Sequence, residues 1–196
     1  MFEEIAFNEY RHVRFIRETL LSLGVEPVAR PEVDLFNSFN AIAQAAGLGP
    51  SFDPFANQTN FALAAENFES VGVTAYAGAS PLLTNKQVIL GSARILAIEA
   101  YHSGILRLLE YQSGSFAQTA SDDIAALRTK LDGNPANVDQ GVLVGGHPNL
   151  TPTDPNGLAL SRTTREVLDI DYGAPYAAKG GFFPNGLNGV IKSCWG

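Results

Sequence analysis

The sequence predicts an all-α protein whose core is a bundle of long helices. Three stretches, residues 1–23, 60–77 and 85–111, have the apolar periodicity of amphipathic helices. Two of these stretches carry the same Glu-x-x-His pattern, which is typical of metal-binding helix bundles. Glycine and proline lie mostly outside the three stretches, and this distribution predicts long ordered loops.

Composition and charge narrow the class of protein. The chain has 196 residues, of which 45% are hydrophobic, so it suits one domain with a full core. Its net charge of -7 argues against nucleic-acid binding, which requires a basic patch. No apolar run is long enough to span a bilayer. Cys194 is the only cysteine, which rules out an intrachain disulfide, and we expect it to be an idle thiol.

The first predicted helix, residues 1–23, ends at Gly24. Glycine is the usual residue in the left-handed position after a helix, and the prolines that follow cannot continue the helix. Residues 25–60 then form a long connection, with a short helix expected at residues 34–46. A connection of that length is usually functional or packs as a layer of its own.

The second long helix is expected at residues 60–77. Small residues such as Gly72 allow a neighbouring helix to approach closely. Glu69 shares the stripe with Gly72, so we expect its side chain to face inward. Glu66 lies on an adjacent stripe and is a second candidate for an inward-facing carboxylate.

The first and third long helices contain the same pattern of residues. In each, a glutamate and a histidine three residues later interrupt an apolar stripe, and an arginine follows. The two sets are Ile5, Glu9, His12, Ile16 and Arg17 in the first helix and Ile95, Glu99, His102, Leu106 and Arg107 in the third. Steps of four, three and four residues place the stripe and its Glu/His pair on one helix face.

A carboxylate and an imidazole on a face that is otherwise apolar are costly to bury without a partner. A metal ion is one such partner, because Glu-x-x-His from each of two helices is half of the ligand set of a dinuclear carboxylate bundle. One such motif alone is commonly a solvated surface pair. Its repetition favours a metal site, and the alternative is a polar core satisfied by hydrogen bonds.

We predict that residues 1–114 form the bundle and that residues 115–196 form short helices and an ordered, irregular arm packed on it. A short helix is expected at residues 119–131, with Asp122 and Asp123 in its first turn, where carboxylates suit the positive helix end.

Two further features belong to the C-terminal part. Thr163 and Glu166 form a capping-box signature that opens a helix running to Asp171. His147 lies in a turn-rich segment, and we expect it to be solvated rather than a metal ligand.

Several segments together resemble the ferritin-like desiccation-related proteins, which were first described in resurrection plants and also occur in bacteria, algae and fungi. No single segment is specific, but together they cover the chain from near its first residue to residue 189. The matching segments are residues 9–17 (EYRHVRFIR), 52–57 (FDPFAN), 68–76 (FESVGVTAY), 98–102 (IEAYH), 150–154 (LTPTD) and 183–189 (FPNGLNG).

The resemblance implies a ferritin-like four-helix bundle with an extended C-terminal region. It also implies a metal-ligand set of Glu9 and His12 from the second bundle helix, Glu69 from the third, and Glu99 and His102 from the fourth. The first bundle helix and its glutamate have no counterpart, and we expect them to lie before residue 1. Three helices alone would leave an apolar stripe open, so we expect that helix, a second copy or a partner chain to cover it.

Carboxylate and imidazole ligands suit iron or manganese, while zinc is a frequent competitor. Five ligands can hold one ion, or two if another carboxylate is supplied, and two redox metals permit dioxygen or peroxide chemistry. Tyr76 is either a hydrogen-bond donor to a ligand or a core tyrosine.

Three functions stay open on the sequence alone. The chain is a metal-binding stress protein, a structural or protective protein with a relic metal site, or a subunit of a larger assembly. The compartment also stays open, although the resemblance points to secretion or an organelle lumen.

Overall fold

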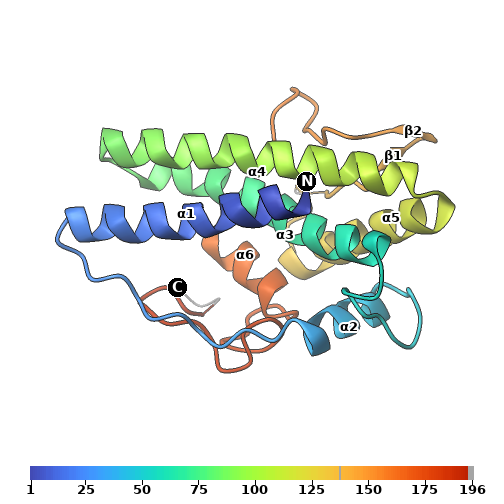
Figure 1. Cartoon of the computed structure of the whole chain (residues 1–196), viewed down its shortest axis with the longest axis horizontal. Coiled ribbons are helices and arrows are strands. Elements are labelled where there is room, and N and C mark those ends of the chain that lie inside the picture. Colours follow the sequence, from blue (N-terminus) through green and yellow to red (C-terminus); the bar gives the residue numbers. More distant parts are fainter. Residues whose placement is uncertain (137, 194–196) are drawn as a thin grey trace.

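The computed structural model describes residues 1–136 and 138–193. Within these ranges, three long helices lie side by side and form the main body of the molecule (Figure 1). They are α1 (Phe2–Ser22), α3 (Gln58–Ala79) and α4 (Lys86–Gln112). The shorter elements are α2 (Phe36–Ala45), the 3-10 helix η1 (Ser80–Leu82), α5 (Ser115–Asp132), the antiparallel strands β1 (Leu143–Val144) and β2 (His147–Pro148), and α6 (Thr164–Asp171). The predicted all-α fold with a loop-rich C-terminal region is confirmed.

The long helices begin and end within two residues of their predicted ranges because local signals set their ends. The side chain of Asn57 accepts a hydrogen bond from the N–H of Asn60 and caps α3. Asn85 caps α4 in the same way. After α1, Gly24 has a φ of 75°, a left-handed conformation that glycine adopts without strain.

The start of α5 differs from the predicted one. The helix begins at Ser115 rather than four residues later, so Asp122 and Asp123 lie in its middle and not in its first turn. The carboxylate of Asp122 accepts a hydrogen bond from the backbone N–H of Leu143 at 3.4 Å. Asp122 therefore contacts the hairpin of β1 and β2, a contact between distant segments that helix-end electrostatics did not anticipate.

The C-terminal arm after α6 and the long connection before α3 lie together on one side of the bundle (Figure 1). The predicted capping box of Thr163 and Glu166 opens α6. The buried ring of Phe182 lies 4.9 Å from the ring of Phe39 on α2 and 4.6 Å from that of Phe68 on α3. These contacts hold the arm against both helices.

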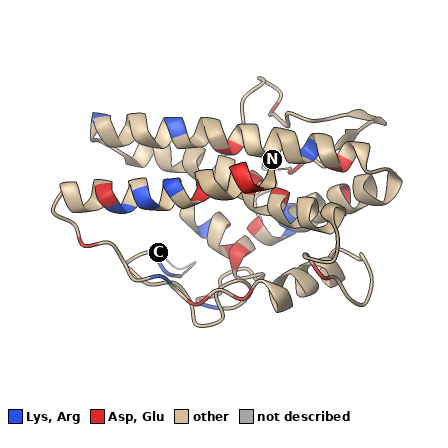
Figure 2. Ribbon diagram, in the orientation of Figure 1, with Lys and Arg blue, Asp and Glu red and all other residues tan. Residues whose placement is uncertain are grey.

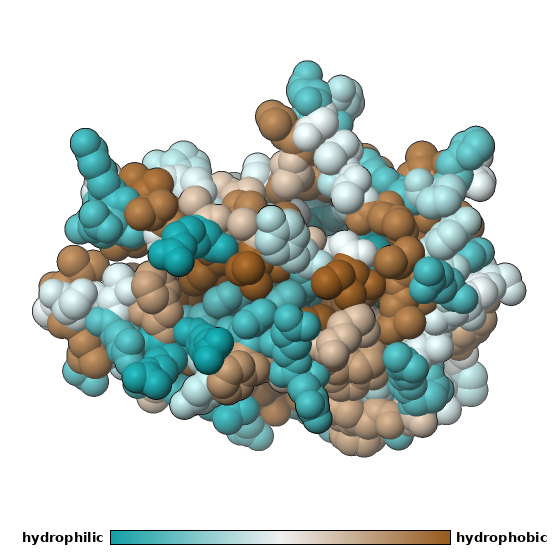
Figure 3. Space-filling view, turned by 45° about the horizontal axis from the view of Figure 1, so that its top comes forward, coloured by the Kyte–Doolittle hydropathy of each residue, from teal (hydrophilic) through white to brown (hydrophobic). Residues whose placement is uncertain are grey.

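Helix α1 is the least covered of the three long helices. Among its residues only Ile5 is buried, where it packs with Ala62 and Leu106. Figure 2 shows acidic residues near the first turns of α1 and basic residues farther along it. Hydrophobic side chains also reach the surface of the molecule, as Figure 3 shows. On α1 and α4 these exposed side chains include Phe7, Tyr10, Val13, Tyr101, Ile105 and Leu108.

Helix α3 carries buried polar side chains as well as apolar ones. Among them are Glu66 and Glu69, which are 3% and 5% exposed. Both glutamates therefore face the interior, although they lie on different stripes of the helix. No helix in the described ranges is long and apolar enough to cross a membrane. The predicted free thiol, Cys194, lies outside the described residues.

Candidate metal centre

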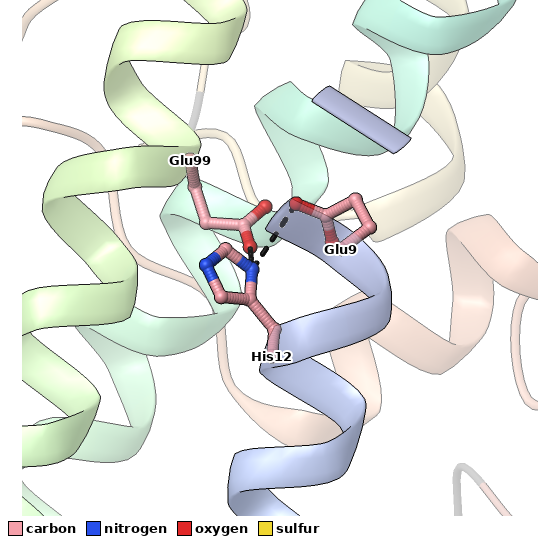
Figure 4. A group of neighbouring side chains, drawn as sticks. All are labelled: Glu9, His12 and Glu99. Atoms are coloured by element: carbon pink, nitrogen blue, oxygen red, sulfur yellow. Dashed lines mark ion pairs between the residues drawn. The ribbon is translucent and has the colours of Figure 1, made fainter. Parts of the chain in front are cut away.

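The five predicted ligands come from three helices and meet in the interior of the bundle. Helix α1 supplies Glu9 and His12, α3 supplies Glu69, and α4 supplies Glu99 and His102. Their ligand atoms form two groups that could hold a metal ion. One group is Glu9, His12 and Glu99 (Figure 4), and the other is Glu9, Glu69 and His102. Within each group the atoms all lie within 4.8 Å of one another, and Glu9 belongs to both.

The two imidazoles face carboxylate oxygens at short range. Nδ1 of His12 lies 3.1 Å from Oε1 of Glu9 and 3.2 Å from Oε1 of Glu99. Nδ1 of His102 lies 3.3 Å from Oε1 of Glu9 and 3.3 Å from Oε2 of Glu69. The Glu9 side chain is 41% exposed, so the site is open on its α1 side.

Four of these atoms are buried without a hydrogen bond to any described residue. They are Glu9 Oε1, His12 Nδ1, Glu69 Oε2 and His102 Nδ1. Buried polar atoms are nearly always satisfied, so each exception needs a physical explanation. Atoms bound to one ion at about 2.0–2.2 Å lie about 3 Å apart, and here the imidazole nitrogens lie 3.1–3.3 Å from the carboxylate oxygens. The donor set therefore fits a metal ion.

The electrostatics of the group also favour a cation. Burial, followed by repulsion from Glu99 and Glu9, raises the pKa of Glu69 to about 10. Burial and the charge of Glu9 raise the pKa of Glu99 to about 7, and burial lowers the pKa of His102. No lysine or arginine in the described ranges forms an ion pair with the three carboxylates. A divalent cation would remove this repulsion.

Two neighbouring residues position the ligands. Gly72 on α3 leaves room for Glu99, because a Cβ atom there would overlap the Glu99 carboxylate. The side-chain amide nitrogen of Asn8 lies 3.2 Å from Nε2 of His102. Asn8 was not among the residues predicted from the sequence. The sequence feature that could have identified Asn8 is its position three residues after Ile5, which places it beside the apolar stripe of α1.

The other candidates take different positions. Glu66 is buried but pairs with Arg107 and Arg128, and it belongs to neither group. His147 is exposed on β2 and is likewise outside both groups. Tyr76 lines a cavity together with Glu69 and Glu99. Burial, then Glu99 and Glu9, raise the pKa of Tyr76, so it is a neutral phenol that can donate a hydrogen bond.

Comparison with known proteins places these residues in a family. Residues 1–112 match the family model described as a ferritin-like domain. The chain is 32% identical over 185 residues to "Desiccation-related protein PCC13-62" from Craterostigma plantagineum, covering 84% of this chain and 57% of that protein. It is 26% identical over 207 residues to "Ferritin-like catalase Nec2" from Nesocodon mauritianus, covering 96% of this chain and 65% of that protein.

The chain thus spans less than two thirds of the length of these two relatives. No solved structure gives a significant match. The segment that matches the family model contains all five predicted ligands, and the chain belongs to the ferritin-like desiccation-related protein family.

Proposed function

We propose that this chain is a stress protein that binds iron or manganese through Glu9, His12, Glu69, Glu99 and His102 and decomposes hydrogen peroxide. The observation that carries the proposal is the set of four buried ligand atoms that approach one another without hydrogen bonds. Hydrogen bonds alone leave these atoms unsatisfied, whereas one or two cations would satisfy them.

The donor set supports the choice of metal. Three carboxylates and two imidazoles suit iron or manganese, although zinc competes for such sites. Two ions are the better fit to the geometry, because Glu9 belongs to both ligand groups and would be shared between them. The Nε2 atom of His102 faces the Asn8 amide, which can orient the ring for metal binding through Nδ1 when its oxygen faces the ring.

The relatives support the choice of reaction. One carries the name ferritin-like catalase, and the other is named for desiccation. Bound iron or manganese would supply the reversible electron transfer that peroxide disproportionation needs. The protein's own part is to hold the ions by buried carboxylates and to leave an approach at the exposed side of Glu9.

Elemental analysis and peroxide consumption test this proposal together. The purified protein should contain iron or manganese and consume peroxide, and a chelator should abolish both. His12→Ala should lower metal content and activity, whereas His147→Ala, which changes an exposed histidine on β2, should change neither. Metal-free protein that cannot be loaded would favour the structural alternative with a relic site.

We further propose that another helical segment, from a second copy or a partner chain, covers the exposed apolar side chains of α1 and α4. Phe7 of α1 is 54% exposed and Tyr101 of α4 is 67% exposed, and large hydrophobic side chains left in water on packed helices are typical of an interaction surface. Sedimentation should show an oligomer or a complex. A compact monomer that does not bind a hydrophobic dye would contradict this expectation.

A further inference from the structure

Two adjoining cavities lie beside the metal centre and share one wall. The larger, of about 690 Å³, reaches Glu9, Glu69 and Glu99. The smaller, of about 350 Å³, extends between α3 and α6 to Leu187 and Ile191 of the C-terminal arm. The residues that line both cavities are Ala75 and Tyr76 of α3 and Val167 and Asp171 of α6.

Asp171 is the only carboxylate on this shared wall, and its side-chain oxygens have no hydrogen-bond or ion-pair partner among the described residues, although its backbone carbonyl accepts from the N–H of Phe182. Burial raises the pKa of Asp171 to about 7. Asp169, on the same helix, is different. One of its oxygens accepts from Arg165 at 2.7 Å and the other from the N–H of Tyr176 at 2.6 Å. Asp169 holds the local structure together, whereas nothing in the described fold uses the Asp171 carboxylate.

We propose that Asp171 is the proton-transfer residue of the site, accepting protons from one hydrogen peroxide molecule in the larger cavity and returning them to the oxygens of a second. The inference rests on the proposed peroxide-handling function. Helix α6 lies outside residues 1–112, so this carboxylate comes from the part of the chain that follows the ferritin-like domain.

The balance of the reaction shows what such a residue must do. Two molecules of H2O2 give one O2 and two H2O. The molecule that is oxidised releases two electrons and two protons, and both are taken up by the second molecule as its O–O bond breaks. The Asp171 carboxylate accepts a proton from the first molecule and returns it to an oxygen that leaves as water, and this transfer occurs twice in each cycle.

The other titratable groups around the cavities are less suited to this role. Glu9 on α1, Glu69 on α3 and Glu99 on α4 are occupied as ligands. Tyr76 is too weak an acid. Arg162, which lines the smaller cavity, is paired with Asp132 and Asp139. Acid–base groups work best when both protonation states are populated at the working pH, and Asp171 meets this condition near neutrality.

The test compares Asp171→Asn, which keeps the shape but cannot titrate, with Asp171→Glu, which keeps the acid. In metal-loaded protein we expect Asp171→Asn to lower peroxide turnover about 100-fold at unchanged metal content, and Asp171→Glu to restore much of it. The pH profile of the wild type should show a titration near pH 7 that Asp171→Asn abolishes. Glu18→Gln, a change on the exposed face of α1, is the matched control and should leave turnover unchanged.

A second measurement does not depend on activity. Infrared difference spectra of wild type and Asp171→Asn should reveal a protonated carboxyl group that titrates near pH 7 and is missing from the variant. If the wild type is active and Asp171→Asn retains its turnover and pH profile, the role of Asp171 is wrong while the peroxide function stands. Loss of metal from Asp171→Asn would also overturn the proton-transfer role, because it would show that Asp171 supports the structure of the metal centre instead. A metal-loaded wild type that leaves peroxide untouched would overturn both proposals.

Discussion

The interior of the bundle contains two buried polar regions only one helical turn apart on α3, and they solve the problem of buried charge differently. Glu69 belongs to the candidate metal centre, where, among the described residues, carboxylates and imidazoles meet without an ion-paired lysine or arginine. Glu66 lies 3.2 Å from Nη1 of Arg107 and 3.4 Å from Nη1 of Arg128. In this second region, which we call the arginine network, three arginines face three carboxylates. The members are Arg107, Arg128, Arg162, Glu66, Asp132 and Asp139.

The difference teaches which buried charges are structural. In the arginine network the chain supplies its own cations, so the charges of these six members are balanced and hydrogen-bonded without an external ion. Beside them, burial raises the pKa of Glu110, whose oxygens have no hydrogen bond to a described residue. In the metal centre the chain supplies three carboxylates and no lysine or arginine, and burial together with the mutual repulsion of the carboxylates raises the pKa values of Glu69 and Glu99. A site that a protein leaves without a cation is where an external cation is expected to bind.

The largest expected effect is in the arginine network. Arg107→Met would leave Glu66 without one of its two cationic partners inside the core, at a cost of about 3–5 kcal/mol of unfolding free energy. Because no metal is involved, urea unfolding should show the same loss with and without chelator. Arg17→Met is the matched control. Arg17 follows the first motif but is exposed and donates to the carbonyl of Val28, so its loss should cost less than about 1 kcal/mol. If the loss of unfolding free energy in Arg107→Met depended on metal, the arginine network and the metal centre would be energetically coupled rather than independent.

The next largest effect should depend on bound metal, unlike the effect of Arg107→Met. His102→Ala should lower the melting temperature of metal-loaded protein and leave the chelated protein nearly unchanged, because the carboxylates of the chelated protein already lack a cation. Binding at 100 times the dissociation constant stabilises a protein by about 2.7 kcal/mol, which sets the scale of the loss. Thermal melts of both proteins in chelator, and then in manganese or ferrous iron, distinguish a metal site from a relic site. Equal losses in both conditions would instead indicate a lost buried hydrogen bond, of about 1–3 kcal/mol, in a relic site.

Acidity should affect Glu69 and Glu99 of the metal centre and Asp139 of the arginine network in opposite directions. Glu99 and Glu69 have pKa values raised to about 7 and about 10, so they hold protons in the folded, metal-free protein that the unfolded chain has lost. The contribution of these two carboxyl groups to stability is therefore greatest at low pH and falls as pH rises from about 4.5 towards 7 and then towards 10.

Burial alone would raise the pKa of Asp139, but Arg128 and Arg162 outweigh burial and lower it. Its contribution is present above about pH 4 and is lost as the protein is acidified below that. Melting temperatures of chelated wild type and Glu99→Gln across pH check both signs: the variant should lose the decline between pH 4.5 and 7, keep a smaller decline at higher pH from Glu69, and keep the loss of stability below pH 4. Metal binding must displace protons from Glu69 and Glu99, so affinity should rise with pH.

The smallest expected effect concerns Asn8, which contacts His102 but no carboxylate of the centre in the described structure. Asn8→Leu should weaken metal binding about tenfold, because the imidazole loses the partner of its Nε2 atom. Asn8→Asp keeps an acceptor oxygen and should bind metal nearly as the wild type does. Competition with a chelator of known affinity measures both variants. Equal affinities for the leucine and aspartate variants would show that Asn8 does not orient the ring.

The sequence by itself determined the features that depend on neighbouring residues. The spacing of Glu9 and His12, and of Glu99 and His102, places each pair on one helix face wherever the helix lies. The Thr163–Glu166 capping box is likewise local and predicted the start of α6, and the Asn57 and Asn85 caps place the starts of α3 and α4 within two residues of the predicted ones.

Only the tertiary structure decided what each inward face meets. The sequence made both Glu66 and Glu69 candidates for the interior. The structure distinguishes them, because Arg107 of α4 and Arg128 of α5 form ion pairs with Glu66. The same motif is followed by an exposed arginine on α1 and a buried one on α4, because the backbone at Gly141 and Asn149 packs over α4. Helix periodicity is a property of a few turns, whereas the partner of a buried charge depends on segments far away in the chain.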